Sequence, residues 1–308
     1  MPPAIAQHPL DEAPAASGGA SAPAIEARTF DIDCRLQYQV NGPSDFLFQL
    51  HALHGMDQAV LTESLVVTPS LPLHVYEDPT VHHRFTRVHA DAGPLDLRYQ
   101  ARVRRQAVPV DPTWPEVPIA ELPDAVLHNL MPTRYCESDH LANAALRLFG
   151  GLPPGASRVQ AVADWIHKNI EYRLGSSQAT TTARDVFVQR AGVCRDFAHL
   201  GVTFCRALNI PARLVVGYAC FDEPPPDFHA VFEAFVGGRW VMFDPTRLAP
   251  VEGLVRIAVG RDAKDVAFAT IFGPSTMVSM APEIRLAATP LGEVGRLSDT
   301  QVGVHQAE

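Results

Sequence analysis

The sequence lacks the features that mark several large classes of protein. It has no excess of Lys and Arg, since its formal net charge is −9, so we expect neither nucleic acid nor a membrane as a partner. Its five cysteines are widely spaced and form no CxxC pair, which argues against a disulfide framework or a zinc ribbon. It contains no HExxH motif and no DxDxDG loop, and we predict no metal and no cofactor.

The chain also lacks the signals of export and membrane insertion. Residues 1–27 contain no Lys or Arg and no long apolar run, so they do not resemble a secretory signal. Apolar stretches such as residues 214–216 are far too short to cross a bilayer. Together with the cysteine usage, these absences predict a cytoplasmic protein.

What the chain does contain is a hydrophobic fraction of 47%, enough for a sizeable core. Ala, Pro, Ser and Gly dominate residues 1–28, which we predict to be a disordered tail. Apolar and polar residues alternate through residues 29–108, as in an antiparallel β domain. Prolines concentrate in residues 109–130, which we expect to form a stiff, extended connector. Residues 131–289 then form a second domain, and residues 290–308 a flexible tail.

The second domain changes from helical to strand periodicity along its length, which is the α+β pattern. Apolar residues three and four positions apart predict helices at residues 139–149, 157–170, 184–190 and 194–208. Strands are predicted at residues 213–219, 228–235, 239–243 and 253–259.

Cys194 stands at the predicted start of a helix and is the candidate nucleophile. The positive end of a helix favours a thiolate, and a backbone N–H at that position can donate to an oxyanion. Gly192 precedes the cysteine and would let the backbone approach a substrate closely.

A histidine and an aspartate follow on one predicted hairpin. Gly237-Gly238 is a two-residue hairpin loop signal, and pairing across it places Val236 opposite Arg239. The same register puts Asp244 on the face of His229, one diagonal step away. The aspartate can then hold one ring nitrogen while the other faces the thiol. The three residues together predict acyl chemistry through a thioester.

Other polar residues near these motifs are open to two interpretations. Gln178 could donate to an oxyanion, although a loop hydrogen bond is the more common role of such a residue. Asp185 and Asp196 fit the first turn of a helix, where a carboxylate is stabilised. Cys205 lies three turns beyond Cys194 on nearly the same face, so it belongs in the core.

Three segments resemble the core of the bacterial transglutaminase-like superfamily. They are TTARDVFVQRAGVCRDFAHL at residues 181–200, the histidine strand, and WVMFDPT at residues 240–246. The resemblance covers about residues 130–285, and the β region before it is similar in kind to the domain that often precedes this core. It implies a papain-like fold with a Cys–His–Asp triad on Cys194, His229 and Asp244.

The chain departs from the family pattern beside two of these residues. Arg195 follows the nucleophile where glutamine is common, and Phe228 and Val231 replace parts of a Ser-His-Ala-Trp run. These changes alter the pocket wall, and our candidates for substrate binding are Gln178, Gly192, Arg195 and Phe228. The chain lacks the additional β domains of the calcium-dependent animal enzymes, so we expect no calcium requirement.

Members of this family act as cysteine proteases, amidases or acyltransferases. Our leading hypothesis is a hydrolase of peptide or isopeptide amide bonds, with a peptide or protein substrate. An acyltransferase is the alternative, because only the access of the second substrate differs. A third hypothesis is a binding module with a vestigial triad.

Overall fold

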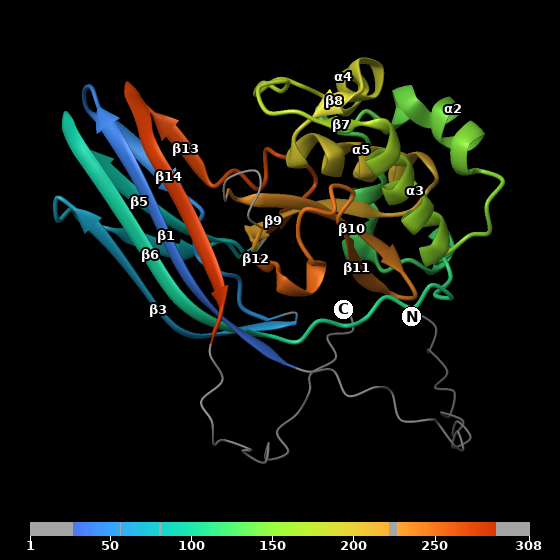
Figure 1. Ribbon diagram of the computed structural model, residues 1–308, viewed down its shortest axis with the longest axis horizontal. Coiled ribbons are helices and arrows are strands. Elements are labelled where there is room, and N and C mark those ends of the chain that lie inside the picture. Colours follow the sequence, from blue (N-terminus) through green and yellow to red (C-terminus); the bar gives the residue numbers. More distant parts are fainter. Residues whose placement is uncertain (1–26, 56, 80–81, 222–226, 288–308) are drawn as a thin grey trace, which may run out of the picture.

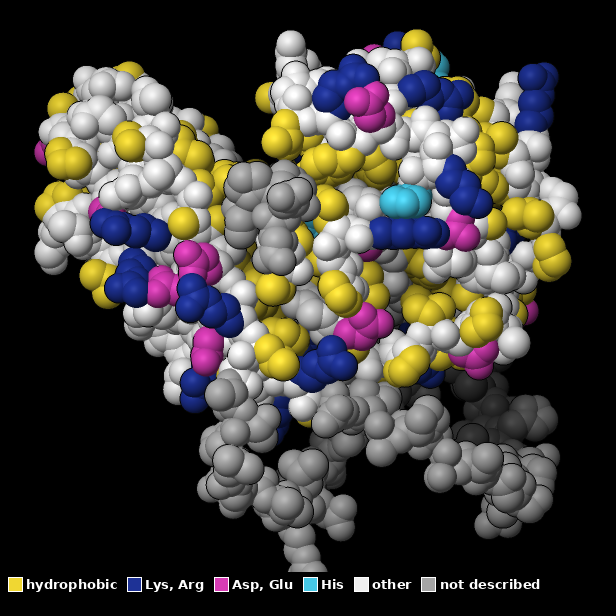
Figure 2. Space-filling view, viewed as in Figure 1, with side chains coloured by type: hydrophobic (Ala, Val, Ile, Leu, Met, Phe, Trp, Pro, Cys, Tyr) yellow, Lys and Arg dark blue, Asp and Glu magenta, His cyan; other side chains and the backbone are white. Residues whose placement is uncertain are grey.

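The computed structural model describes residues 27–55, 57–79, 82–221 and 227–287. One lobe consists of β-sheets, and the other packs helices against a sheet (Figure 1). A notch separates the two lobes at the top of the space-filling view (Figure 2). The predicted tails fall outside the described residues, apart from residues 27 and 28.

The β lobe contains two antiparallel four-stranded sheets, with strand orders β14-β1-β6-β3 and β13-β2-β5-β4. Buried and exposed residues alternate along β1 and β6, as predicted. Tyr38 of β1 packs edge-on against Phe46 of β2, with ring centroids 5.4 Å apart. The strands are β1 (Arg28–Val40), β2 (Ser44–Phe48), β3 (Gln58–Thr68), β4 (His74–Glu77), β5 (Arg84–Ala90), β6 (Gly93–Arg105), β13 (Ala269–Phe272) and β14 (Ser275–Leu286).

Strands β13 and β14 correct the predicted domain boundary. We assigned residues 131–289 to the second domain, but β13 pairs with β2 and β14 pairs with β1. The chain therefore returns to the first lobe after completing the second (Figure 1). Alternating polarity identifies a strand and its buried face, but it carries no information about which strand will be the neighbour.

The second lobe packs helices on a sheet of order β11-β10-β9-β12, so the predicted α+β fold with a preceding β domain is confirmed. Helix α5 is central, and all eight residues of β10 are buried. The helices are α2 (Ser138–Phe149), α3 (Ala156–Asn169), α4 (Ala183–Gln189) and α5 (Cys194–Ala207). The strands are β7 (Glu171–Tyr172), β8 (Ala191–Gly192), β9 (Ala212–Tyr218), β10 (His229–Val236), β11 (Arg239–Phe243) and β12 (Val255–Gly260).

The proline-rich connector packs more closely than we predicted for a linker. It contains the short helices η1 (Ile119–Glu121), α1 (Asp124–Leu127) and η2 (His128–Leu130). Leu122 and Val126 are buried against Phe235 of β10. The connector is therefore part of the second lobe, because its apolar residues cover one end of the sheet.

The β lobe covers edge strand β12 of the second lobe. The N–H groups of Leu53 and of the Gln58 side chain donate to the carbonyl of Arg256, at 3.0 and 2.9 Å. The Gln58 amide oxygen accepts the Arg256 N–H at 2.9 Å. His83 accepts the Val259 N–H through Nε2 at 3.1 Å. These bonds satisfy an edge that would otherwise be open, so the two lobes form one structural unit.

A network of buried charged side chains crosses the interface between the two lobes, here called the seam. Asp57 and Arg105 of the β lobe pair with each other at 3.2 Å, and Asp57 also pairs with Arg256 of β12. Glu233 of β10, which is fully buried, accepts from Nη2 of Arg256 at 2.7 Å and from Nε of Arg213 of β9 at 2.8 Å. Because Glu233 lies four residues after His229, this network anchors the strand that carries the histidine.

Candidate active site

Cys194 is the first residue of α5 and is half-buried. Asp196 accepts the Val193 N–H at 2.9 Å, which fixes the beginning of the helix. Gly201 lies so close to Phe232 of β10 that an added Cβ would meet its ring at 2.5 Å. This close contact holds α5 against β10, the strand that begins with His229.

The hairpin forms with the predicted register. Val236 pairs with Arg239 and Phe235 with Trp240, across a loop whose two glycines have φ values of 60° and 74°. Positive φ at both loop positions is the geometry that favours glycine and joins two strands without splaying them. Asp244 directly follows β11, so the register carries it to the histidine.

The predicted contact between His229 and Asp244 is present. Nε2–H of His229 donates to Oδ2 of Asp244 at 2.9 Å, and both side chains are buried. The backbone N–H and the hydroxyl of Thr246 donate to the other carboxylate oxygen, at 2.8 and 2.7 Å. The aspartate is therefore held from both sides, and Nδ1 is left as the ring nitrogen available to the thiol.

Protonation of the histidine is strongly favoured by its partners. Burial alone disfavours the imidazolium, but the hydrogen bond to Asp244, the nearby Cys194 sulfur and the charges of both groups raise the pKa of His229 to about 10. Burial likewise opposes ionisation of Asp244, yet His229 and Thr246 hold its pKa below the usual value. In the described part of the chain, Nδ1 is buried without a conventional hydrogen-bond partner. The site thus holds an imidazole poised to exchange a proton with sulfur.

Tyr172 is a site residue that the sequence analysis missed. Its hydroxyl lies close to both the backbone N–H and the sulfur of Cys194. Burial and the charge of the Cys194 thiolate raise the pKa of Tyr172, so the phenol stays protonated. Its ring packs 5.8 Å from that of Phe197. Strand β7 places Tyr172 opposite Gly192 of β8, two residues before the cysteine.

Two of the candidate substrate-binding residues lie together beside the nucleophile. Arg195 donates through Nη2 to the Ser177 hydroxyl and to the Gln178 carbonyl, both at 2.8 Å. Gln178 is exposed, and this contact uses its backbone. Arg195 therefore ties the loop before α4 to the first turn of α5.

The structure assigns Gly192 and Phe228 other environments than we expected. An added Cβ at Gly192 would lie 2.7 Å from Cβ of Asp196, so glycine at this position makes room for the helix turn. The Phe228 ring is buried and stacks on Phe268 with centroids 4.7 Å apart. Its carbonyl oxygen, 4.0 Å from the Cys194 sulfur, is the part that faces the site.

Other candidate groups have structural environments. His199 is buried, its Nε2 accepts the Ala263 N–H at 3.1 Å, and burial lowers its pKa to about 3. Asp185 and Thr182 form a capping box at the start of α4. Within the described ranges, no group of three metal-ligating side chains occurs. In the same ranges, no helix combines the length and hydrophobicity that a bilayer crossing needs.

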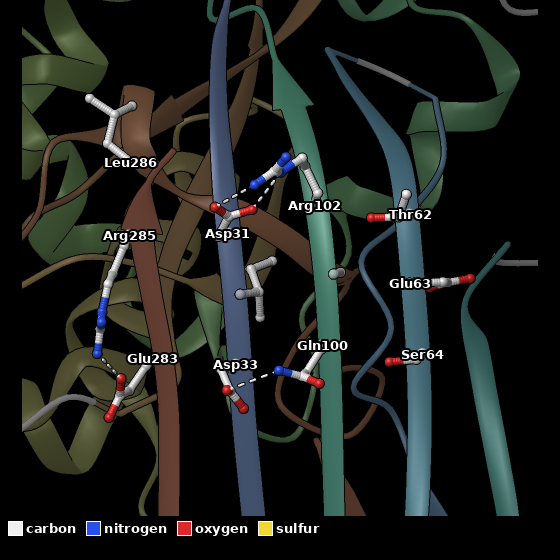
Figure 3. A pocket seen from close by; sticks show the side chains of 12 residues that line it. Asp31, Asp33, Thr62, Glu63, Ser64, Gln100, Arg102, Glu283, Arg285 and Leu286 are labelled. Carbon is white, nitrogen blue, oxygen red and sulfur yellow. Dashed lines mark hydrogen bonds and ion pairs between the residues drawn. The ribbon is translucent and has the colours of Figure 1, made fainter. Parts of the chain in front are cut away.

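A shallow cavity of about 620 Å³ lies on the outer face of the β lobe (Figure 3). Its charged side chains bond to one another across neighbouring strands. Arg102 pairs with Asp31 at 2.6 Å, and Gln100 donates to Asp33 at 3.1 Å. Basic and acidic side chains lie side by side on this lobe in Figure 2. We interpret this surface, here called the outer ladder, as a solvated sheet face.

Two family descriptions match separate parts of the chain. Residues 142–245 match the transglutaminase-like superfamily, and residues 28–125 match the N-terminal domain of bacterial transglutaminases. The first match includes all three residues of the proposed triad and Tyr172.

Known proteins extend this likeness over most of the chain. The crystal structure of "a Putative Cysteine Protease" from Cytophaga hutchinsonii is 43% identical, with a TM-score of 0.82, and the match covers 87% of this chain and 93% of that one. ML0607 of Mycobacterium leprae, described as uncharacterized, is 32% identical over 50% of this chain and 58% of its own length. Rv2569c of Mycobacterium tuberculosis is 32% identical over 34% of this chain, and only 38% of that relative is spanned. The chain belongs to the transglutaminase-like superfamily.

Proposed function

We propose that the protein is a cysteine-dependent hydrolase of peptide or isopeptide amide bonds that works through a thioester. The observation that carries this proposal is the placement of His229 between the Asp244 carboxylate and the Cys194 sulfur. A buried imidazole with one nitrogen held by a carboxylate and the other facing a thiol is the arrangement that activates a cysteine.

The reaction follows from these positions. His229 accepts the thiol proton, and the Cys194 thiolate attacks the carbonyl carbon of the amide. The imidazolium then protonates the departing amine through Nδ1, leaving an acyl group on sulfur. A water molecule gives a proton to His229 and attacks the thioester, and the thiolate leaves as the acid is released. Asp244 keeps the ring oriented and stabilises its charged form throughout.

Tyr172 supports the same proposal at the oxyanion. The backbone N–H of Cys194 stands at a helix start, and the Tyr172 hydroxyl lies against it. A phenol hydroxyl next to the attacking sulfur is a donor that can stabilise the negative oxygen of the tetrahedral intermediate. The raised pKa of Tyr172 keeps its hydroxyl available as a donor at neutral pH.

Acyl transfer to an amine is the second candidate function, because an amine can replace water in the last step. The observation that favours it is the exposed carboxylate of Asp227, two residues before His229. A non-catalytic binding module is the least consistent with the site, because all three triad residues and the hydrogen bond between His229 and Asp244 are present. We further propose a cytoplasmic location, since the five cysteines are all free thiols in the structure.

Digestion of a peptide library, compared with the Cys194→Ala variant, tests the proposal. We expect cleavage by the wild-type protein only, with a mass increase at Cys194 when the reaction is quenched early. A labelled primary amine in the same mixture separates hydrolysis from transfer, because transfer incorporates the label. Equal activity of the two proteins, or iodoacetamide labelling of Cys194 at the rate of free cysteine at every pH, contradicts an enzyme.

A further inference from the structure

Asp227 places a carboxylate at the edge of the site that the mechanism above does not use. It stands immediately before Phe228 and β10, and its Oδ1 accepts the Phe228 N–H at 2.6 Å. Phe228 is itself fixed, because its ring stacks on Phe268 and its carbonyl lies 4.0 Å from the Cys194 sulfur. The backbone therefore places Asp227 directly before the residue whose carbonyl faces the nucleophile.

Two groups of the site interact electrostatically with this carboxylate. The charge of Asp227 acts on Tyr172, which lies close to Cys194, and the charge of His229 acts on Asp227. Desolvation by the surrounding protein raises the pKa of Asp227, which the Phe228 N–H and His229 partly offset. The charged form of a partly desolvated carboxylate is stabilised when a cation binds next to it, and such a cation can arrive with the substrate.

No arginine or lysine of the described residues neutralises Asp227. The guanidinium of Arg195, which follows the nucleophile, donates to Ser177 and Gln178. Asp244 accepts from His229 and Thr246. Among the described residues, Asp227 is thus a carboxylate next to the triad that no cationic side chain pairs with, and the residue is exposed.

We propose that Asp227 binds the primary ammonium group of the amine partner in the reaction, a lysine-type amine that leaves in isopeptide cleavage or enters in acyl transfer. This inference rests on the proposed function, since it concerns the amine side of the same thioester. By microscopic reversibility, one subsite serves both directions. An alkylamine is almost fully protonated near neutral pH, so a carboxylate raises its local concentration beside His229. Water is uncharged, and the carboxylate does not raise its concentration in this way.

The transfer step balances with the groups present. The bound ammonium loses one proton to solvent and a second to Nδ1 of His229, and its nitrogen attacks the thioester carbonyl carbon. The carbon–sulfur bond breaks, and Cys194 leaves as a thiolate paired with the imidazolium. The products are an amide and the resting enzyme, without any added cofactor.

The test measures how an acetylated enzyme divides its acyl group between two amines. p-Nitrophenyl acetate acetylates Cys194, and the Cys194→Ala protein gives the background to subtract. Butylamine, which is cationic at pH 7.5, then competes with methoxyamine, which is uncharged at that pH. The measured quantity is the ratio of the two amide products by mass spectrometry.

We expect Asp227→Asn and Asp227→Ala each to lower the butylamine-to-methoxyamine ratio at least about tenfold, because a charge-assisted hydrogen bond is lost. Asn keeps the size of the side chain and its acceptor for the Phe228 N–H. Glu171→Gln is the matched control, because Glu171 precedes Tyr172 but pairs with Arg173, and its ratio should equal that of the wild type.

A ratio that is the same in Asp227→Asn and wild type overturns the inference while leaving the proposed function intact. An equal fall in the Glu171→Gln protein also overturns it, because general charge loss would then explain the effect. If wild-type Cys194 accepts no acetyl group at all, the proposed function and this inference both fail.

Discussion

Two pairs of opposite charges in this molecule have similar contact distances and very different surroundings. His229 Nε2 and Asp244 Oδ2 are 2.9 Å apart, with side chains only 1% and 4% exposed. Arg102 Nε and Asp31 Oδ1 of the outer ladder are 2.6 Å apart, with side chains 53% and 45% exposed. Water and salt screen the exposed pair, whereas burial lets the first pair determine the protonation state of a ring. Distance alone does not separate the two pairs, and burial does.

Burial alone, however, does not mark a site of chemistry. The Glu233 carboxylate is as deeply buried as His229, yet both of its oxygens accept from arginine side chains, Arg213 and Arg256. His229 instead keeps Nδ1 free of a conventional partner within the described residues, on the side of a half-buried thiol. The candidate active site thus differs from the seam between the lobes in that one buried polar atom, Nδ1 of His229, has no conventional hydrogen-bond partner.

The largest effect should come from removing the charge that steadies His229. Asp244→Asn should lower kcat about 10²- to 10⁴-fold, because the ring loses its oriented and charge-stabilised form. In the wild type, the raised pKa of about 10 keeps the imidazolium protonated far above neutrality. As the pH is raised, the variant should therefore lose activity earlier than the wild type. The alkaline limb of its kcat/KM profile should move down toward the ordinary pKa of histidine.

A pH–rate profile of both proteins measures this shift. Asp31→Asn removes an aspartate of the outer ladder and serves as the control, with a profile like that of the wild type. An alkaline limb at the same pH in Asp244→Asn and wild type would show that the aspartate does not set the protonation of His229.

The next largest effect should be a loss of folding stability when the buried carboxylate of the seam, Glu233, is replaced. Glu233→Gln should lower the free energy of unfolding by about 3–5 kcal/mol, because Arg213 and Arg256 are left buried without their shared carboxylate. Burial opposes ionisation of Glu233, but the two arginines lower its pKa to about 2. A carboxyl group whose pKa is lower in the folded than in the unfolded protein stabilises the fold at pH values above its unfolded pKa. This stabilisation is lost as the pH falls through the folded pKa.

Urea unfolding at several pH values checks this prediction. The stability difference between wild type and Glu233→Gln should be constant above about pH 5 and shrink as the pH falls toward 2. Glu283→Gln, which affects an exposed pair on β14, is the control. A difference that does not change with pH would mean that lost packing, and not charge, accounts for the destabilisation.

A smaller loss should follow from removing the Tyr172 hydroxyl. Tyr172→Phe should lower kcat about 10²- to 10³-fold with little change in KM, because the donor acts on the oxyanion and not on the ground state. Tyr135→Phe removes a hydroxyl that bonds to a loop carbonyl at 2.8 Å and should stay close to the wild type. Steady-state kinetics distinguish the two, and a loss confined to KM in Tyr172→Phe would assign the tyrosine to substrate binding.

Local periodicity was sufficient to predict the part of the site that one hairpin determines. Gly237-Gly238 sets the loop length, and the period of two along a strand then sets the faces, so the contact of His229 with Asp244 follows from residues less than twenty apart. Helix α5 was also predictable, because its apolar spacing begins at the cysteine.

Contacts that depend on pairing between distant or very short elements were not predictable in this way. Tyr172 reaches Cys194 through β7 and β8, strands of two residues each that carry no periodic pattern. The return of β14 to β1 joins Phe30 with Leu286, and polarity does not specify such a partner. The close packing of Gly192 against Asp196 was not predictable for a related reason, because the helix turn that fills this space is seen only after folding.

The smallest effect should come from the outer ladder, and it completes the comparison of exposed and buried pairs. A double-mutant cycle with Asp31→Asn and Arg102→Gln should give a coupling energy of at most about 1 kcal/mol, since both side chains are about half exposed. The coupling should decrease further in high salt, because exposed charges are screened. Neither substitution should change kcat, since the ladder lies on the outer sheet face and shares no residue with the triad (Figure 3). A coupling above about 2 kcal/mol, or a loss of activity in either variant, would mean that this exposed surface contributes to function and that burial is not the criterion that separates the two pairs.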